Sequence, residues 1–493
     1  MAALLLLAGC PNTKLNPEIL ELSAGDHAIQ EQVLIEPIAG LDQDFMRGVD
    51  VSSLAEIEKH GGIYYNERGE AEDLFSILKR NGVNWIRLRV WNRPVNERDV
   101  YAGGKVIAPK GSPVGGGNNS VEADIPLAQR AKKAGMKLLL DFHYSDFWAD
   151  PAKQTMPQDW KGLDAGELNE AVKTFTKDSL VAFIKAGARP DMVQIGNELN
   201  GGFLWPLGKT WKSKGDRDIG GMGGFATLLK SAAAGVREAQ GNRAKIKIMI
   251  HLANGGDNAL YHSVFDPLTR TGLDFDVIGL SFYNYWHGST AELKANLADL
   301  AQSYGKELVV VETAYGFTED DADGTGNNFQ IYSDEDYGYR PSAQGQASVV
   351  RDLMEAVSSV PLGRGLFYWE PAWIPVSGAG WRTGEGSSWE NQAMFDFKGR
   401  VLPSMAVWNL VYGRGAIENR WGGSARPGGP ALPLEQAEEI RIRCLPGAEP
   451  ALPASVKMRY SDDSERRTAV SWEKHDWQAE SGEGTVILQG RAA

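Results

Sequence analysis

The hydrophobic pattern of the chain changes repeatedly between two kinds of segment. Short apolar, β-rich runs are each followed by a stretch with the period of an amphipathic helix. The predicted strands are residues 45–52, 83–91, 136–143, 192–198, 245–252, 275–283, 307–314 and 363–370. The predicted helices are residues 72–81, 125–134, 167–185, 224–240, 258–265, 290–304, 343–358 and 404–412. This alternation predicts an α/β protein with a parallel sheet.

Eight strand–helix units in about 370 residues favour a closed barrel over an open sheet. An open, doubly wound sheet would need a dinucleotide-binding fingerprint, which we do not find. We therefore expect a (β/α)8 TIM barrel at residues 45–415.

The pattern changes after the barrel. Residues 416–433 are rich in Gly and Pro and are predicted to be a linker. Residues 434–493 contain only short strand-like runs, at 439–444, 455–461, 467–472 and 485–490, which predicts a small all-β sandwich. Leu452–Ser461 and Val470–Trp472 resemble a bacterial Ig-like module found beside secreted glycosidases. We expect this domain to be a spacer or an accessory module.

The first ten residues form an apolar run that ends in Cys10, and Leu7–Cys10 resembles the lipobox of bacterial lipoproteins. The resemblance implies a signal peptide at residues 1–9, a lipid on Cys10, and an exported protein anchored to the bacterial cell envelope or surface. Residues 10–44 would then be a tether. The run is too short to span a membrane. Because no basic residue precedes it, a chance run of leucines is the alternative.

Composition narrows the possible functions. The chain has 493 residues, of which 42% are hydrophobic and 23% charged, as in ordinary globular proteins. Its net charge of −13 would repel a phosphate backbone, so we expect no nucleic-acid partner. Tryptophan is as frequent as tyrosine, at 15 each, and indole rings suit a ligand with flat apolar faces. We expect a monomer.

Two predicted strands end in a carboxylate, Glu198 and Glu312. The active site of such a barrel lies at the carboxyl ends of its strands, and the two-residue period points both side chains into the barrel mouth. A pair of carboxylates is the minimum apparatus for glycoside hydrolysis. The alternative is two solvated glutamates where strands become loops.

Other side chains at the strand ends suit a sugar ligand. Arg87 and Arg89 are expected on the inner face of their strand, because the outer face would bury both guanidinium groups under apolar helices. A cation there would keep a neighbouring carboxylate ionised. Candidates for contacts with sugar hydroxyls and ring faces are Trp91, His143, Asp146, Trp148, Trp205, Trp286 and Trp369. His143 taken alone is more often a core histidine than a functional one.

Seven segments resemble the motifs of glycoside hydrolase family 53, the endo-β-1,4-galactanases. They are Gly48–Ser53, Asn84–Trp91, Asp141–Pro151, Gln194–Glu198, Gly202–Pro206, Val311–Tyr315 and Tyr368–Pro371. They occur in order within residues 45–415. The resemblance implies a retaining enzyme that cleaves internal β-1,4-galactosidic bonds in galactan and in the type I arabinogalactan of pectin side chains.

The resemblance also implies roles for individual residues. Glu198 would be the acid/base and Glu312 the nucleophile. Asn197 would bond the sugar 2-hydroxyl, and Tyr283 would orient the nucleophile, with Arg87 or Arg89 close by. A retaining mechanism requires the two carboxyl groups to be about 5–5.5 Å apart.

An acidic segment follows the seventh predicted strand. Asp321, Asp323, Thr325 and Asn327 alternate with small residues, which resembles a loop that supplies oxygen ligands to a hard cation. Some bacterial members of the family hold calcium in a comparable loop. We expect a structural calcium site here and no cofactor for catalysis. An acidic, solvated loop is the alternative.

Two other functions remain open at this stage. A mannanase or cellulase with the same kind of barrel would carry the same carboxylate pair. A lipid-anchored glycan-binding protein without turnover would keep the aromatic residues but lose one glutamate.

Overall fold

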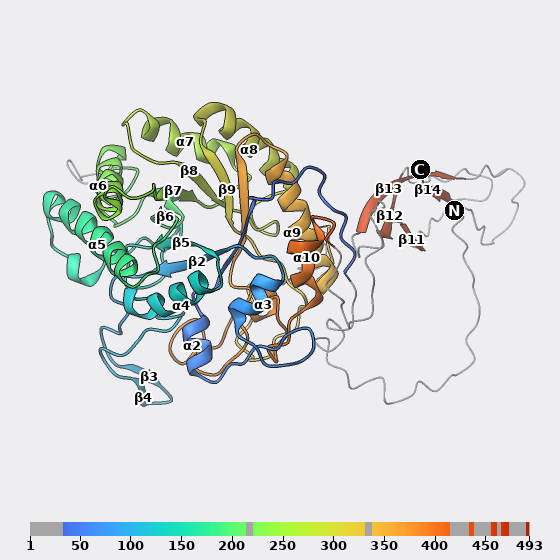
Figure 1. Cartoon of the computed structure of the whole chain (residues 1–493), viewed down its shortest axis with the longest axis horizontal. Helices are drawn as coiled ribbons and strands as arrows, with labels where there is room; N and C mark the ends of the chain where they lie inside the picture. The colour runs from blue at the N-terminus through green and yellow to red at the C-terminus, as the bar shows by residue number, and fades with distance from the viewer. Residues whose placement is uncertain are drawn as a thin grey trace, which may run out of the picture.

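A closed barrel of eight parallel strands forms the core of residues 46–368 (Figure 1). The computed structural model describes residues 33–212, 220–330 and 338–414, and the backbone of four later strands. The strands are paired in the order β1-β10-β9-β8-β7-β6-β5-β2, and β1 closes the ring against β2. They are β1 Met46–Asp50, β2 Trp85–Val90, β5 Lys137–Phe142, β6 Met192–Ile195, β7 Lys247–Leu252, β8 Val277–Ser281, β9 Glu307–Glu312 and β10 Gly363–Tyr368. The predicted (β/α)8 fold is confirmed.

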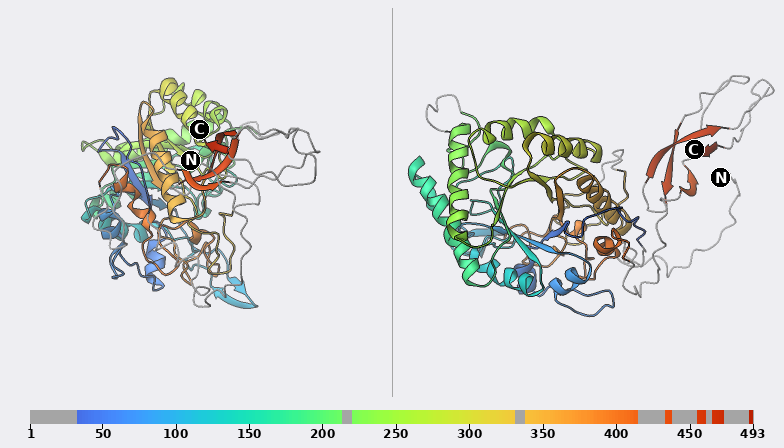
Figure 2. Two further views of the ribbon diagram at one scale, coloured as in Figure 1. Left: turned by 90° about the vertical axis from the view of Figure 1, so that its right-hand side faces the viewer. Right: turned by 45° about the horizontal axis from the view of Figure 1, so that its top comes forward.

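Helices surround the barrel (Figure 2). They are α2 Leu54–Lys59, α3 Leu74–Arg80, α4 Val121–Lys133, α5 Ala165–Lys185, α6 Met222–Gln240, α7 Asn258–Thr269, α8 Thr290–Tyr304, α9 Ala343–Ser358 and α10 Val407–Leu410. Helices α5 and α8 begin at capping boxes, because Asp164 and Ser289 each accept a bond from the backbone three residues later. The predicted helix at 404–412 is instead a 3-10 turn, Pro403–Ala406, followed by the short α10.

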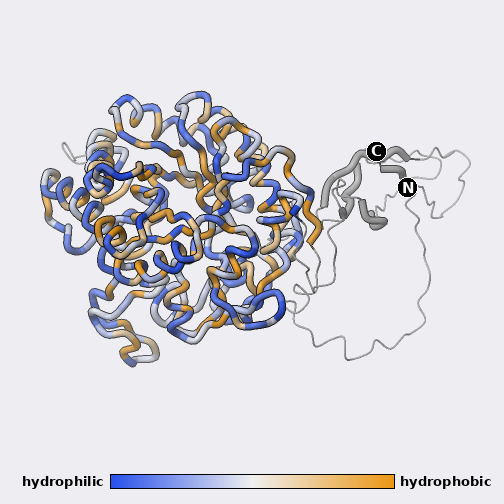
Figure 3. The backbone as a smooth tube through the Cα atoms, viewed as in Figure 1, coloured by the Kyte–Doolittle hydropathy of each residue, from blue (hydrophilic) through white to orange (hydrophobic). Residues whose placement is uncertain are grey.

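One apolar layer closes the interior of the barrel below the strand ends. All eight strands contribute to it, with Met46, Trp85, Leu139, Met192, Met249, Val277, Val309, Val311 and Phe367. Outside the barrel, hydrophobic and hydrophilic residues alternate along the helices, as expected for helices with one buried face (Figure 3). The packed interior leaves the carboxyl ends of the strands as the place for chemistry.

A small hairpin in the connection after β2 was not predicted. It consists of β3, Val100–Ala102, and β4, Lys105–Ala108, and it projects from the barrel in Figure 1. Strands of three and four residues are too short for a periodic signal in the sequence.

A second, antiparallel sheet follows the barrel in sequence. Its order is β11-β12-β13-β14, with β11 Pro433–Ala437, β12 Ser455–Tyr460, β13 Glu465–Trp472 and β14 Gly490–Ala492. Strands β12 and β13 coincide with two predicted runs, whereas the run at 439–444 lies outside the described residues.

The amino-terminal predictions also lie outside the described residues, since these begin at residue 33. The signal peptide, Cys10 and most of the tether are therefore not part of the described structure. Within the described residues, every helix is too short or too polar to cross a membrane.

Candidate active site

Glu198 and Glu312 reach the barrel mouth by different backbone routes. Glu312 is the last residue of β9, as predicted. Strand β6 ends at Ile195, however, and the chain turns through Gly196 at φ 103° before Glu198 adopts a left-handed conformation at φ 49°. A Cβ on Gly196 would meet the Leu199 side chain at 2.6 Å, so the turn requires glycine. The two-residue period does not reach Glu198, and the predicted reason for its orientation is wrong.

Both carboxylate oxygens of Glu312 are held by side chains from other elements, namely β2 and the connection after β8. Arg87 Nη2 lies 2.7 Å from Oε1, and the Tyr283 hydroxyl donates to Oε2 at 3.1 Å. Burial raises the pKa of Glu312, and the neighbouring Arg87 guanidinium opposes that rise. The carboxylate is thus fixed in orientation next to a cation.

Glu198 lies in a less polar environment. Its Oε1 accepts a hydrogen bond from the Ser281 hydroxyl at 2.7 Å. Burial, and next the negative charge of Glu312, raise the pKa of Glu198 well above its usual range. Two carboxylates with such unequal surroundings are suited to different roles: the Arg87 cation favours the ionised form of Glu312, whereas burial and the charge of Glu312 favour the protonated form of Glu198.

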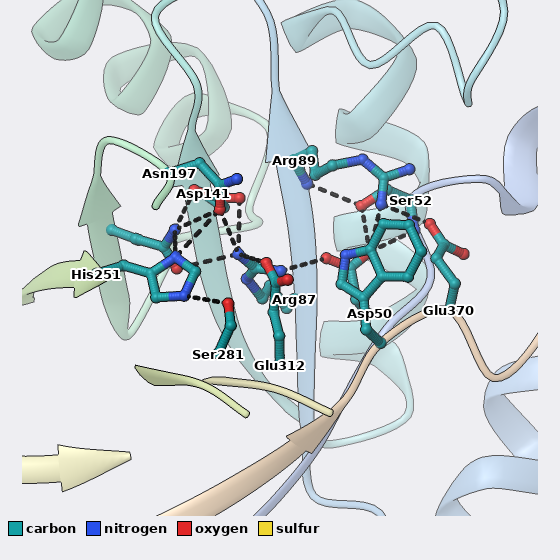
Figure 4. A network of polar contacts seen from close by, with 12 residues as sticks. Asp50, Ser52, Arg87, Arg89, Asp141, Asn197, His251, Ser281, Glu312 and Glu370 are labelled. Carbon is teal, nitrogen blue, oxygen red and sulfur yellow. Dashed lines mark hydrogen bonds and ion pairs between the residues drawn. The ribbon is translucent and has the colours of Figure 1, made fainter. Parts of the chain in front are cut away.

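Arg87 lies at the centre of a buried ion-pair network (Figure 4). Besides Glu312 it pairs with Asp50 at 3.0 Å and with Asp141 at 2.8 Å. Arg89 instead pairs with Asp50 at 3.2 Å and with Glu370 at 2.6 Å. Of the two arginines proposed near the nucleophile, Arg87 is therefore the one in contact. Both side chains are fully buried, so the prediction that they contact substrate is wrong. They instead pair with the buried carboxylates of the site.

Two further predicted sugar ligands, His143 and Trp91, are buried. Both ring nitrogens of His143 are used internally, because Nδ1 accepts from the Ala149 N–H and Nε2 contacts Asp141 at 3.1 Å. Trp91 has no exposed surface and packs edge-on against Trp148 at 5.1 Å. Neither side chain is accessible from outside, so the prediction that they contact substrate is wrong. Both instead pack beneath the residues of the site.

Asp146 anchors loops. Its two carboxylate oxygens accept from the backbone N–H groups of Arg93 and Gln158. It therefore joins the connection after β2 to the one after β5.

Trp148 and Trp369 belong to an aromatic cluster at the barrel mouth. Trp148 stacks on Trp381 at 4.6 Å, and Trp369 packs edge-on against Trp389 at 4.5 Å. The Arg89 guanidinium lies 4.4 Å from the Trp148 ring centre. Both predicted tryptophans are buried, with 6% of each residue's surface exposed.

Exposed tryptophans lie on the connections after β6 and β8. Trp286 is 51% exposed. Trp205 is half-buried and packs edge-on against Trp211, which is 46% exposed, at 5.5 Å. The Lys209 ammonium group lies 5.7 Å from the centre of the Trp205 ring and 5.4 Å from the centre of the Trp211 ring. Sequence reasoning missed Trp211, although an indole six residues after Trp205 in a Gly- and Lys-rich loop was a visible signal.

Asn197 is buried beside Arg87. Its Nδ2 donates to the Ala149 carbonyl at 2.8 Å, and its Oδ1 accepts from Arg87 at 3.2 Å. The amide is thus held immediately before Glu198.

A third carboxylate, that of Glu390, lies beside the acidic loop, and the sequence did not suggest it. Asp321 and Asp323 form a group with Glu390 of the connection after β10, and their ligand oxygens lie within 4.8 Å of one another. Asn327 is buried, whereas the Thr325 backbone N–H donates to Asp323. Glu390 lies 67 residues beyond Asp323 in the sequence, which is why spacing alone could not find it.

Comparison with known proteins identifies the barrel. Residues 46–408 match the family described as Glycosyl hydrolase family 53. The chain belongs to glycosyl hydrolase family 53. Residues 437–493 match the bacterial Ig-like domain, group 4, which accounts for the second sheet.

Family 53 relatives cover the barrel almost completely. The chain is 36% identical to the endo-beta-1,4-galactanase of Bacillus subtilis over 440 residues, which are 83% of this chain and 96% of the relative. The structure of the GH53 catalytic domain of Ignisphaera aggregans is 45% identical, with a TM-score of 0.68 over 77% of this chain and 99% of that one. A fungal beta-1,4-galactanase structure is 35% identical, with a TM-score of 0.61 over 74% of this chain and 98% of that one. This family 53 protein is therefore a glycoside hydrolase.

Proposed function

We propose that the protein is an endo-β-1,4-galactanase, which hydrolyses internal β-1,4-galactosidic bonds in galactan and type I arabinogalactan. The observation that carries this proposal is the pair of half-buried Glu198 and buried Glu312, which lie in unequal surroundings at the mouth of a family 53 barrel. The galactanase names of its relatives supply the substrate class.

The surroundings of the two carboxylates support a double displacement. Glu312, held ionised by Arg87 and Tyr283, attacks the anomeric carbon while protonated Glu198 gives its proton to the departing oxygen. The ionised Glu198 then takes a proton from water, and that water oxygen replaces Glu312 on the anomeric carbon. Two inversions give net retention. In this scheme Asn197 bonds the 2-hydroxyl, and the rings of half-buried Trp205 and exposed Trp286 contact sugar faces.

The assay that tests the proposal compares three polysaccharides. Short galacto-oligosaccharides should be released from β-1,4-galactan, with a rapid loss of viscosity that indicates internal cuts. Mannan and carboxymethylcellulose should yield little product. Faster release from either of these would indicate a mannanase or cellulase instead. Proton NMR of the first product should show the β-anomer before mutarotation.

We also propose a structural calcium site in which Glu390 joins Asp321, Asp323 and Asn327. Two buried oxygens, Glu390 Oε2 and Asn327 Oδ1, have no hydrogen-bond partner among the described residues. Carboxylate and amide oxygens of this kind are what calcium prefers. Such an ion would tie the connection after β9 to the one after β10, and no catalytic step depends on it. The side-chain oxygen of Thr325 is a further candidate ligand.

We propose further that lipid on Cys10 anchors the exported protein to the cell envelope, with the Ig-like domain as a spacer. Radiolabelled palmitate should enter the full-length protein and be absent from a Cys10→Ala variant, which should appear in the medium. Equal labelling of both would contradict the anchor. Size-exclusion chromatography of the C10A variant tests the expected monomer.

A further inference from the structure

A chain of hydrogen bonds leads from the backbone of Glu198 back to its own carboxylate. The Glu198 N–H donates to Nδ1 of His251, at 3.3 Å, on the neighbouring strand β7. Nε2 of His251 lies 2.8 Å from the Ser281 hydroxyl at the end of β8. That hydroxyl donates to Oε1 of Glu198 at 2.7 Å. His251 and Ser281 are completely buried, and both are labelled in Figure 4.

The direction of this chain follows from the groups around Nδ1. A backbone N–H can only donate, so the contact with Glu198 makes Nδ1 an acceptor. Gln194 Nε2 also approaches Nδ1, at 2.9 Å, and its amide cannot be flipped: Nε2 donates to Asp141, while Oε1 accepts from Arg87.

Asn197 Oδ1 also lies 3.1 Å from Nδ1, but it already accepts from Arg87 and Gln194. The proton of His251 is therefore on Nε2 and donates to Ser281. Because Ser281 receives that bond, its own proton is directed to Glu198.

His251 keeps this tautomer because it stays neutral. Burial, and next the Arg87 cation, lower the pKa of His251 well below its usual range. Because Nδ1 of the neutral ring accepts from N–H donors, the ring can donate only through Nε2, and the acceptor there is the Ser281 hydroxyl. Ser281 is consequently a permanent donor to one oxygen of Glu198.

We propose that Ser281, oriented by His251, occupies Oε1 of Glu198 and leaves Oε2 as the oxygen that exchanges a proton with the glycosidic oxygen and with water. A proton on Oε1 would compete with the Ser281 donor, so the acidic proton belongs on Oε2. Ser281 and His251 are positioning residues, since they act through Glu198. The inference rests on the proposed acid/base role of Glu198.

The bond from Ser281 also favours the ionised form of Glu198, in opposition to burial. Ser281→Ala should therefore raise the pKa of Glu198 and move the alkaline limb of kcat/KM to higher pH. Other groups near Glu198 remain in the variant. They are Glu312 of β9, Arg87 of β2, Asp150 after β5, His251 of β7, Tyr261 of α7 and Tyr283 after β8.

Two substrates separate a positioning role from a general structural one. With galactan, Ser281→Ala should lower kcat/KM at least tenfold, because an acid catalyst contributes about 10²–10⁴-fold and its orientation is impaired. With a dinitrophenyl β-galactobioside, the leaving group needs no proton, and kcat/KM should stay within about twofold. Ser281→Thr keeps the hydroxyl and should restore both the rate and the pH limb.

The matched control is Ser404→Ala, which also removes a buried hydroxyl, one that donates to Gln346 away from the carboxylates. It should move neither the pH limb nor the ratio of the two rates. Equal losses of Ser281→Ala on both substrates, with an unmoved limb, would overturn the inference. If that variant does not fold, nitrogen NMR of the unaltered enzyme decides: a proton on Nδ1 of His251 contradicts the proposal. Full galactan activity of Glu198→Ala would instead overturn the proposed function.

Discussion

Arg87 Nη2 lies 2.7 Å from Glu312 Oε1, and neither side chain has appreciable contact with solvent. The same guanidinium also serves Asp50 and Asp141, so one cation offsets three buried carboxylates. Arg87 is therefore a main determinant of the charge state of Glu312 and of the stability of the barrel mouth, although Asp50 also pairs with Arg89.

Arg87→Met should destabilise the protein by about 3–5 kcal/mol, because it leaves buried carboxylates without their cation. It should also lower kcat by raising the pKa of Glu312. Urea unfolding and the acid limb of the pH–rate profile measure the two effects. The surface variant Arg68→Met, whose ion pair with Glu70 is exposed, is the control and should leave the urea midpoint almost unchanged. A change as small as this for Arg87→Met would contradict the role assigned to the network.

Glu312→Ala should abolish turnover of galactan, and azide should restore part of it. Azide can enter the space left by the carboxylate and attack the anomeric carbon once, which gives an α-galactosyl azide of inverted configuration. Product NMR identifies the anomer. Glu307→Ala, at the other end of β9 and paired with Lys247, should keep its turnover. An active Glu312→Ala variant without azide would refute the assignment of the nucleophile.

Trp211→Ala should weaken galactan binding with little change in kcat. Its exposed ring packs against Trp205, and the two rings lie seven (Trp205) and thirteen (Trp211) residues beyond Glu198. Loss of one stacking ring is worth about 1 kcal/mol, or about fivefold in KM. The same KM for Trp211→Ala and the unaltered enzyme would exclude Trp211 from the substrate path.

A chelator should lower the melting temperature by a few degrees if calcium joins the two loops. Burial, and next the neighbouring Asp323 and Asp321, raise the pKa of Glu390 to about 7, so the shift should shrink below pH 7 as Glu390 becomes protonated. Glu390→Gln should remove most of the shift, and elemental analysis should find less calcium in that variant. No effect of chelator on the unaltered protein would leave the loop without a structural metal.

His262 should make stability depend on pH. Hydrogen bonds to Asp299 and Asp266 raise its pKa above the usual value. A raised folded pKa gives stability that is fully present below the unfolded pKa of about 6.5 and is lost as pH rises through the folded pKa. Denaturant midpoints should therefore fall over that interval, and His262→Gln should flatten the fall. Parallel curves for both proteins would show that another group titrates.

Local sequence determined most of the fold and one half of the catalytic pair. The order of apolar runs and amphipathic stretches was sufficient for the eight strands, because each strand of a parallel barrel is buried on both faces. Glu312 was located correctly for the same reason, since it is the last residue of such a run. The short β3–β4 hairpin carried no comparable signal.

Only the tertiary structure decided which polar groups meet and how deeply they lie. Periodicity reports which face of a strand a residue occupies, but not its burial or its partner, so it could not separate Arg87 from Arg89. Nor could periodicity show that the side chains of Trp91 and His143 are buried. Glu390 joins Asp321, and Ser281 meets Glu198, across large separations in sequence. Contacts of this kind exist because the barrel closes and brings the ends of distant strands together.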